Sequence, residues 1–456
     1  MPGSSCIGHE IVENGELELD VKHSHPILVY PAEPTRKQVY SLSNLDQIFV
    51  VPVSTVYFFN SRQNKKNHDA VAVIKDSLRK LLVLYYPMAG RLGVSEDSRF
   101  QIQCEGQGVL FVEAVADCSI AELGERYRPA PFMTQLVYNN PQTSGHSSVE
   151  LDVPLLCVQV TRFKCGGFVL GLCMNHCIAD AFVASEFLVA WGELARGSVD
   201  ISHLAPNLDR TLLNKRSPLR IEFPHLEFRE IDEVISSRTN ESSTTICSSS
   251  FTVSPHELES VKKRILHHGL VTQVTTFEAL AAMTWQARTQ AVDMHPEQVA
   301  RLVFPVNIRS KLDPPLPARF LGNGVFLGHA TATPAELTQN SLSHIVKLVQ
   351  DAKALVTDKY IRSAVDYLEV HRGKPKSVAL LYISSWIRIP MNVVDFGWGE
   401  PICMGPCSLM DEDAIFASCG DDMKSFEVFI ALPSLQAVET FRRCLRTTIS
   451  SSHSPA

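Results

Sequence analysis

A histidine and an aspartate four residues apart, His176 and Asp180, are the side chains best suited to proton chemistry in this chain. The apolar residues 168–173 lead into them and a helical pattern follows. His176 is therefore predicted at the end of a buried strand, just before a helix begins. A neutral imidazole at the rim of a rigid element accepts a proton near neutral pH, as a general base does. Asp180 suits the N-cap of the helix or an ion pair that holds the local backbone.

A second motif lies far downstream, at residues 395–399, where the sequence reads DFGWG and Pro401 follows. Glycines on both sides of a tryptophan predict a tight turn that is filled by the aromatic ring. Asp395 joins His176 as a candidate catalytic residue. The alternative, which we favour for Asp395, is a structural turn residue held in an ion pair.

The HxxxD and DFGWG motifs, in this order and spacing, resemble those of the plant BAHD acyl-CoA-dependent acyltransferases. The resemblance covers nearly the whole chain and includes residues 85–92, 276–285 and 320–323. It implies an α/β fold of two similar chloramphenicol-acetyltransferase-like domains, with mixed sheets flanked by helices and a solvent channel between them. It also implies acyl transfer from acyl-CoA, used as a co-substrate, to a small-molecule acceptor.

The resemblance gives His176 the role of base toward the acceptor, with a satisfied core histidine as the alternative. Coenzyme A thiolate is already a good leaving group, so no covalent acyl-enzyme is needed, and no GxSxG elbow is present. Asp180 is expected to point away from the substrate and to orient the site by pairing with an arginine, for which Arg309 is the candidate.

Four more residues are expected at the oxyanion and acceptor pocket: Trp386, Ser384, Thr55 and Tyr57. The indole N–H of Trp386 is a candidate donor to the oxyanion, with a packed core tryptophan as the alternative. For Thr55 and Tyr57 we favour the alternative of ordinary strand residues.

The sequence departs from the family pattern at two positions. Ala181 follows the motif aspartate where the family usually has glycine, and its methyl group either crowds the pantetheine arm or is tolerated. Asn307 stands two residues before Arg309 where the family often has aspartate, which weakens the local charge network. A relative that binds coenzyme A esters without catalysis therefore stays an alternative.

Within the family, the chain most resembles hydroxycinnamoyl transferases that act on ω-hydroxy fatty acids and fatty alcohols, through residues 43–47, 168–177 and 362–367. We expect transfer of a feruloyl, caffeoyl or p-coumaroyl group to the hydroxyl of a long-chain aliphatic acceptor, in suberin, cutin or phenylpropanoid metabolism. Shikimate, quinate or a polyamine is the alternative acceptor. Shikimate-using relatives carry an arginine for the acceptor carboxylate in a longer segment than residues 370–377, although Arg372 or Lys374 is a candidate substitute.

Composition narrows the class of protein. The 456 residues are 45% hydrophobic and 20% charged, and the net charge of −7 argues against nucleic-acid binding. No signal peptide is evident, and no run approaches the roughly 18–20 apolar residues of a membrane span. We expect a cytoplasmic monomer without a transmembrane segment. The CxxxC pairs at Cys173 and Cys403 lack the CxxC spacing of zinc sites, so we expect no metal and no tightly bound cofactor.

The element pattern suggests an N-terminal domain over residues 1–200 with HxxxD, a crossover over 201–230, and a C-terminal domain over 231–456 with DFGWG. We expect a β-hairpin that delivers His176 and polar loops at two places. The other expected elements are a helix capped by Asp69, a strand over 100–112, a helix with a capping box at Thr275 and Glu278, a helix over 339–371 and a strand over 378–389; the loops are expected at 139–145 and 236–243.

Overall fold

The computed structural model describes nine segments of the chain. They are residues 19–62, 67–124, 131–138, 151–229, 246–295, 298–371, 380–410, 412–419 and 423–450. The two expected polar loops at 139–145 and 236–243 lie outside these residues, as do Arg372 and Lys374.

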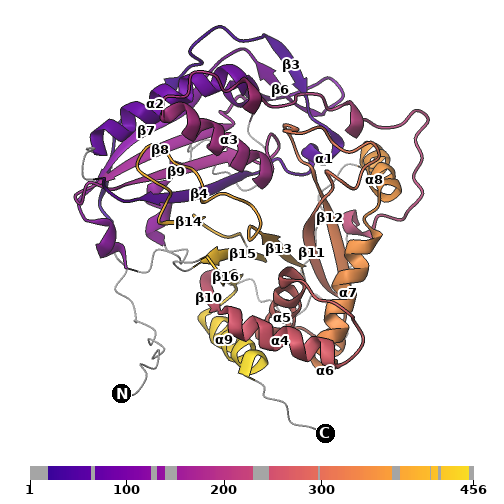
Figure 1. Cartoon of the computed structure of the whole chain (residues 1–456). Helices are drawn as coiled ribbons and strands as arrows, with labels where there is room; N and C mark the ends of the chain where they lie inside the picture. Colours follow the sequence, from indigo (N-terminus) through magenta and orange to yellow (C-terminus); the bar gives the residue numbers. More distant parts are fainter. Residues whose placement is uncertain are drawn as a thin grey trace, which may run out of the picture.

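Two mixed β-sheets form the framework of the molecule (Figure 1). The first sheet has the order β1-β7-β8-β9-β4-β14, with β2 paired to β7, and the second has the order β10-β16-β15-β13-β11-β12. The pairs β7–β8, β11–β13 and β13–β15 are parallel, and the other pairs are antiparallel. The strands of the first sheet are β1 (Val21–His23), β2 (Ile27–Val29), β4 (Pro52–Phe59), β7 (Val109–Ala116), β8 (Leu156–Phe163), β9 (Phe168–Asn175) and β14 (Cys403–Pro406). Those of the second sheet are β10 (Cys247–Val253), β11 (Ala300–Asn307), β12 (Val325–Ala332), β13 (Leu380–Ser385), β15 (Asp413–Cys419) and β16 (Ser425–Leu432).

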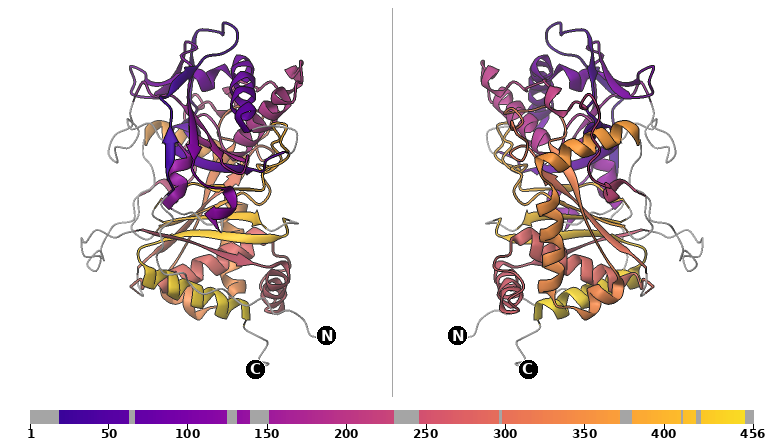
Figure 2. Two further views of the ribbon diagram at one scale, coloured as in Figure 1. Left: turned by 90° about the vertical axis from the view of Figure 1, so that its left-hand side faces the viewer. Right: turned by 90° about the vertical axis from the view of Figure 1, so that its right-hand side faces the viewer.

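Helices cover each sheet and close two large apolar cores. Helices α2 (Asn67–Leu84) and α3 (Ala181–Ala195) pack together over the first sheet, as Figure 1 shows. The side views of Figure 2 show the second group of helices as a layer on the outer face of the second sheet. This group consists of α4 (Pro255–His267), α5 (Thr276–Ala291), α6 (Pro334–Gln339), α7 (Leu342–Leu355) and α9 (Leu435–Ser450). A small sheet of β3 (Gln38–Ser41), β6 (Phe100–Cys104) and β5 (Arg91–Val94) completes the first half.

Each half of the chain contributes residues to the sheet or the core of the other half. Strand β14 comes from the second half, yet it pairs with β4 in the first sheet. In the other direction, the short helix α1 (Asn44–Gln47) and the residues after it contribute Leu45, Ile48 and Phe49 to the core of the second half. The chain therefore crosses between the two sheets more than once, and the proposed domain limits at 200 and 231 stay a prediction.

Several sequence predictions are confirmed. The β8–β9 hairpin delivers His176, and α3 begins directly after Asp180. Thr275 and Glu278 form the predicted capping box at the start of α5.

Other predictions were wrong at the element boundaries. Residues 100–112 form two strands, because Gly106 and Gly108 take positive φ angles in a turn between β6 and β7. The helix predicted over 339–371 is divided, since Thr357 caps a new helix, α8 (Asp358–Val370). The strand predicted over 378–389 ends at Ser385. Asp69 lies inside the first turn of α2, where a carboxylate interacts favourably with the helix dipole, and is not the N-cap.

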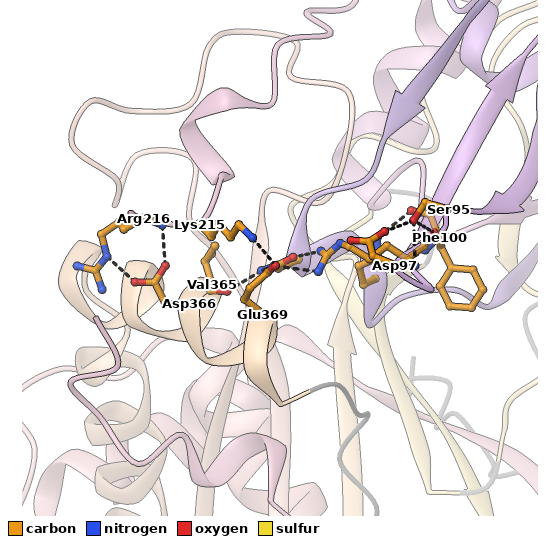
Figure 3. A network of polar contacts seen from close by, with 11 residues as sticks. Ser95, Asp97, Phe100, Lys215, Arg216, Val365, Asp366 and Glu369 are labelled. Atoms are coloured by element: carbon orange, nitrogen blue, oxygen red, sulfur yellow. Dashed lines mark hydrogen bonds and ion pairs between the residues drawn. The ribbon is translucent and has the colours of Figure 1, made fainter. Parts of the chain in front are cut away.

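Helix α8 holds the segment around Lys215 and Arg216, which connects the two halves of the chain, through hydrogen bonds and ion pairs (Figure 3). Asp366 accepts hydrogen bonds from the backbone N–H and Nε of Arg216 at 2.8 and 2.7 Å. Glu369 accepts from Lys215 Nζ at 2.6 Å and from Arg99 Nη1 at 2.9 Å. Two segments that are remote in sequence thus meet at this helix.

The tight packing around β9 yields a stability prediction. A Cβ at Gly171 would lie 2.0 Å from the backbone oxygen of Leu136, so Gly171→Ala forces a backbone shift. We expect a loss of about 1–3 kcal/mol in the free energy of unfolding, measured by urea denaturation. Gly405→Ala is the matched control: both glycines pair with Val56 on β4, yet a Cβ at Gly405 meets nothing within 4 Å. Equal unfolding midpoints for the two variants would contradict this account of the packing.

Candidate active site

His176 lies at the place where the first sheet meets the core of the second half. Its backbone N–H donates to Val51 O at 2.8 Å, which fixes it just past the end of β9. Its imidazole stacks on Phe49, a member of the second core, with a centroid distance of 4.8 Å. The residue is partly exposed, whereas its Nδ1 atom is buried and has no hydrogen-bond partner.

The surroundings of His176 favour a neutral imidazole. Burial lowers the pKa of His176 below its ordinary value of 6.5. The carboxylates of Asp180 and Asp46, the backbone of His176 itself and the side chain of Asn323 act in the opposite direction and limit the decrease. A group of this kind is unprotonated at neutral pH and can accept a proton.

Asp180 points into a buried cluster of donors. It is 2% exposed, caps α3 through Val183 N at 3.0 Å, and accepts the backbone N–H of Gly324 at 2.9 Å. Arg309 donates to both of its oxygens, from Nη1 at 2.8 Å and from Nη2 at 3.0 Å, so the pairing expected from the sequence is present. The orienting role of Asp180 and Arg309 stays a prediction.

A second buried carboxylate, Asp46, was not among the residues predicted for the site. It is fully buried, pairs with Arg210, and accepts from the backbone N–H and from Nδ2 of Asn323, both at 2.8 Å. Asn323 Nδ2 also donates to the backbone oxygen of His176 at 3.0 Å. The signal in the sequence was local: Ser43 and Asp46 form a capping box around α1.

Asp395 lies apart from His176, in a turn of the second half of the chain that packs against the first sheet. Its Oδ1 accepts the backbone N–H groups of Gly397 and Gly399 at 2.6 and 2.8 Å. The turn is plugged by Trp398, which packs against Phe168 at the start of β9. His176 follows the other end of this strand, roughly 25 Å away at about 3.3 Å per residue. The arrangement favours the structural interpretation of Asp395 over the catalytic one.

The four residues predicted to line the pocket lie on two adjoining parts of the fold. Thr55 and Tyr57 share one face of β4, where Thr55 is 7% exposed and Tyr57 is fully buried with an unpartnered hydroxyl. Ser384 lies half-buried on β13. Trp386 directly follows β13, is 8% exposed, and belongs to the core of the first half. Tyr57 therefore packs as a core residue, and the roles of all four residues stay predictions.

The two departures from the family pattern leave the cluster around Asp180 intact. Ala181 is the first residue of α3, where alanine favours the helix. Asn307 Oδ1 accepts the backbone N–H of Arg309 at 3.0 Å, so the side chain still holds the backbone next to the guanidinium.

Metal ligation finds no support in the described segments, which contain no group of three or more His, Cys, Asp or Glu placed to hold an ion. Burial raises the pKa of the Cys173 thiol, and it raises that of Cys407 to about 12, which disfavours the thiolate that a metal requires. In the same segments, no helix is long and apolar enough to cross a membrane.

Comparisons with known proteins agree with the sequence pattern. Residues 19–443 match the model of the protein family described as "Transferase family". The chain is 40% identical over 436 residues to an omega-hydroxypalmitate O-feruloyl transferase of Arabidopsis thaliana, covering 94% of each protein. It is 42% identical over 430 residues to a fatty alcohol:caffeoyl-CoA acyltransferase of Arabidopsis thaliana, covering 93% of this chain and 98% of that protein.

A solved structure supports the fold. The crystal structure of F. graminearum TRI101 complexed with coenzyme A and T-2 mycotoxin matches with a TM-score of 0.75 at 14% identity, covering 89% of this chain and 97% of that chain. The expected architecture of mixed sheets flanked by helices is confirmed.

The buried pair of Asp180 and Arg309 yields a second stability prediction. Arg309→Met leaves a carboxylate that is 2% exposed without its cation. We expect unfolding free energy to fall by about 2–3 kcal/mol, below the usual range for fully buried pairs because the arginine side chain is 22% exposed. Lys80→Met, which breaks the exposed pair with Asp76, serves as the control and is expected to cost less than about 0.5 kcal/mol. Urea denaturation of both variants measures the difference, and similar losses would contradict a structural role for the buried pair.

Proposed function

Because the chain belongs to the Transferase family, the BAHD acyl-CoA-dependent acyltransferases, we propose that it transfers a hydroxycinnamoyl group from coenzyme A to the hydroxyl of a long-chain aliphatic acceptor. The acyl group is feruloyl, caffeoyl or p-coumaroyl, and the acceptor is an ω-hydroxy fatty acid or a fatty alcohol. The names of the two relatives at 40% and 42% identity support the feruloyl and caffeoyl groups and both kinds of acceptor.

The catalytic part of the proposal depends on one observation: His176 is a partly exposed histidine at the end of β9 whose Nδ1 is buried. Nε2 is then the nitrogen that accepts the proton of the acceptor hydroxyl. The hydroxyl oxygen attacks the thioester carbonyl and forms a tetrahedral oxyanion. When the carbonyl re-forms, the carbon–sulfur bond breaks, and the imidazolium returns its proton to the coenzyme A thiolate.

The remaining site residues support this sequence of steps. Asp180 and Arg309 fix the backbone at the start of α3 and so hold the histidine in place. Trp386 and Ser384 are the candidates for contacts with the oxyanion and the acceptor. Asp395 contributes through the turn that it stabilises.

The proposal includes a monomeric, cytoplasmic enzyme that uses acyl-CoA as a co-substrate and holds no tightly bound cofactor. Buried thiols such as Cys104, whose pKa is raised to about 12, suit a reducing compartment. Gel filtration of the purified protein tests the monomer, and its absorption spectrum and metal content test the absence of a bound cofactor.

Two alternatives make different predictions. A polar acceptor such as shikimate, quinate or a polyamine would require a charged group for recognition. A non-catalytic relative that binds coenzyme A esters would explain Ala181 and Asn307 as decay, but the intact contacts of Asp180 and Arg309 weigh against that alternative.

Release of free thiol from feruloyl-CoA distinguishes these functions. We expect turnover with 16-hydroxypalmitate or a fatty alcohol and at least about tenfold lower kcat/KM with shikimate, quinate or spermidine. His176→Ala should lower turnover by at least about 10²-fold, because a general base contributes roughly 10²–10⁴ in rate. Binding of feruloyl-CoA without thiol release in the wild type would establish the non-catalytic alternative. Preference for shikimate would establish the polar acceptor.

The lowered pKa of His176 sets the pH dependence of the reaction. The base acts in its neutral form, so kcat/KM should stay constant through neutral pH and decrease only as the pH falls through the imidazole pKa, which lies below 6.5. The measurement is kcat/KM for feruloyl-CoA across this range, with circular dichroism as the control for folding at each pH. A decrease that is centred above 6.5 would contradict the described environment of His176.

A further inference from the structure

The side-chain amide of Asn323 is held in one orientation. One Nδ2 hydrogen bonds to Asp46 Oδ1 at 2.8 Å, and the other reaches the backbone oxygen of His176 at 3.0 Å. An ionised carboxylate and a carbonyl are acceptors only, so both partners require the nitrogen of the amide and exclude its oxygen. The backbone N–H of Asn323 donates to the same oxygen of Asp46, which removes the remaining freedom of the residue.

This orientation leaves two buried polar atoms unpaired, one on each of two residues that are already joined by a hydrogen bond. Asn323 Oδ1 has no hydrogen-bond donor, and His176 Nδ1 has no partner. Asn323 Oδ1 can only accept a hydrogen bond, and His176 Nδ1 donates one whenever it carries the imidazole proton. The two residues are in contact, because Asn323 Nδ2 donates to the backbone oxygen of His176, and the Asn323 side chain raises the pKa of the imidazole.

On the basis of the function proposed for His176, we propose that Asn323 and Asp46 are positioning residues that select the productive tautomer of the catalytic imidazole. Asp46 fixes the amide, and Asn323 Oδ1 then offers an acceptor to Nδ1–H. A proton held on Nδ1 leaves the lone pair on Nε2, where the acceptor hydroxyl binds. Neither residue touches the reacting atoms.

Asp46 also has a structural role that must be separated from this one. Its ion pair with Arg210 is buried, and its bond from Ser43 Oγ at 2.6 Å stabilises α1. Loss of the carboxylate would leave a buried cation unpaired and would destabilise the protein. Asn323→Ala avoids this complication, because Asp46 keeps Arg210 and Ser43 as partners.

The test compares Asn323→Ala and Asp46→Asn with Ser43→Ala in the full-length protein. Ser43→Ala is the matched control, since it removes one bond to the Asp46 carboxylate and one from the Asp46 backbone N–H, and it retains both bonds from Asn323. For Asn323→Ala we expect kcat to fall roughly 10- to 100-fold, the scale of a misplacement of about 1 Å. KM for feruloyl-CoA and for the acceptor should change less than about threefold.

A purely structural role of Asn323 would leave the pH profile of kcat/KM unchanged, so this profile distinguishes a structural role from a positioning role. Asn323 and Asp46 both raise the imidazole pKa, while Asp180, which acts in the same direction, is unchanged in all three variants. The acid limb of kcat/KM should therefore shift to lower pH in Asn323→Ala and in Asp46→Asn, and stay in place in Ser43→Ala. If Asp46→Asn does not fold, the comparison of Asn323→Ala with Ser43→Ala decides alone.

The possible outcomes separate this inference from the proposed function. A fall in kcat for Asn323→Ala that comes with an unmoved acid limb and a lower melting temperature would reduce the residue to a structural role and overturn the inference. Unchanged kcat and acid limb in Asn323→Ala, together with an inactive His176→Ala, would overturn the inference and leave the proposed function standing. Full activity of His176→Ala would instead remove the function from which the inference starts.

Discussion

Two buried carboxylates from the first half of the chain determine how the halves meet. A buried carboxylate requires cations and N–H donors to compensate for the loss of water. Asp46 and Asp180 find donors on consecutive residues of one loop, because Asp46 accepts the N–H of Asn323 and Asp180 accepts that of Gly324. Arg210 and Arg309 supply the positive charges. A shift of this loop by one residue would break both of these hydrogen bonds, so the two contacts together favour a single registration of the loop.

The position of His176 follows from this contact and from the β4–β9 pair. The strands bring the histidine to one end of the sheet, while the turn around Asp395 closes the other end through Phe396 and Trp398. Helix α1 adds a third constraint, since Asn44 donates to Val365 O on α8 at 2.7 Å. The imidazole is thus placed by rigid elements on several sides, which is the arrangement that holds a catalytic group within a narrow geometry.

Sequence patterns predicted the local features of the site and missed the distant ones. The end of β9, the cap at Asp180 and the capping box of α5 depend on residues within a few positions of each other, which periodicity and capping rules describe. The pairing of Asp180 with Arg309 came from the family resemblance. The bond between Asp46 and Asn323 joins residues 277 positions apart, and nothing in the local pattern of either segment indicates it. The break between α7 and α8 was missed because apolar periodicity continues through the cap at Thr357.

The carboxylates that hold the fold together also tune the base. Burial alone would lower the pKa of His176 and reduce its affinity for a proton, since a desolvated imidazolium is unfavourable. Asp180 and Asp46 oppose this effect, although neither faces the substrate in the proposed mechanism. A base works best with a pKa near the operating pH, because it must be neutral before the reaction and basic enough to take the proton. The same two charges therefore stabilise the contact between the halves and keep the partly buried imidazole basic enough to react.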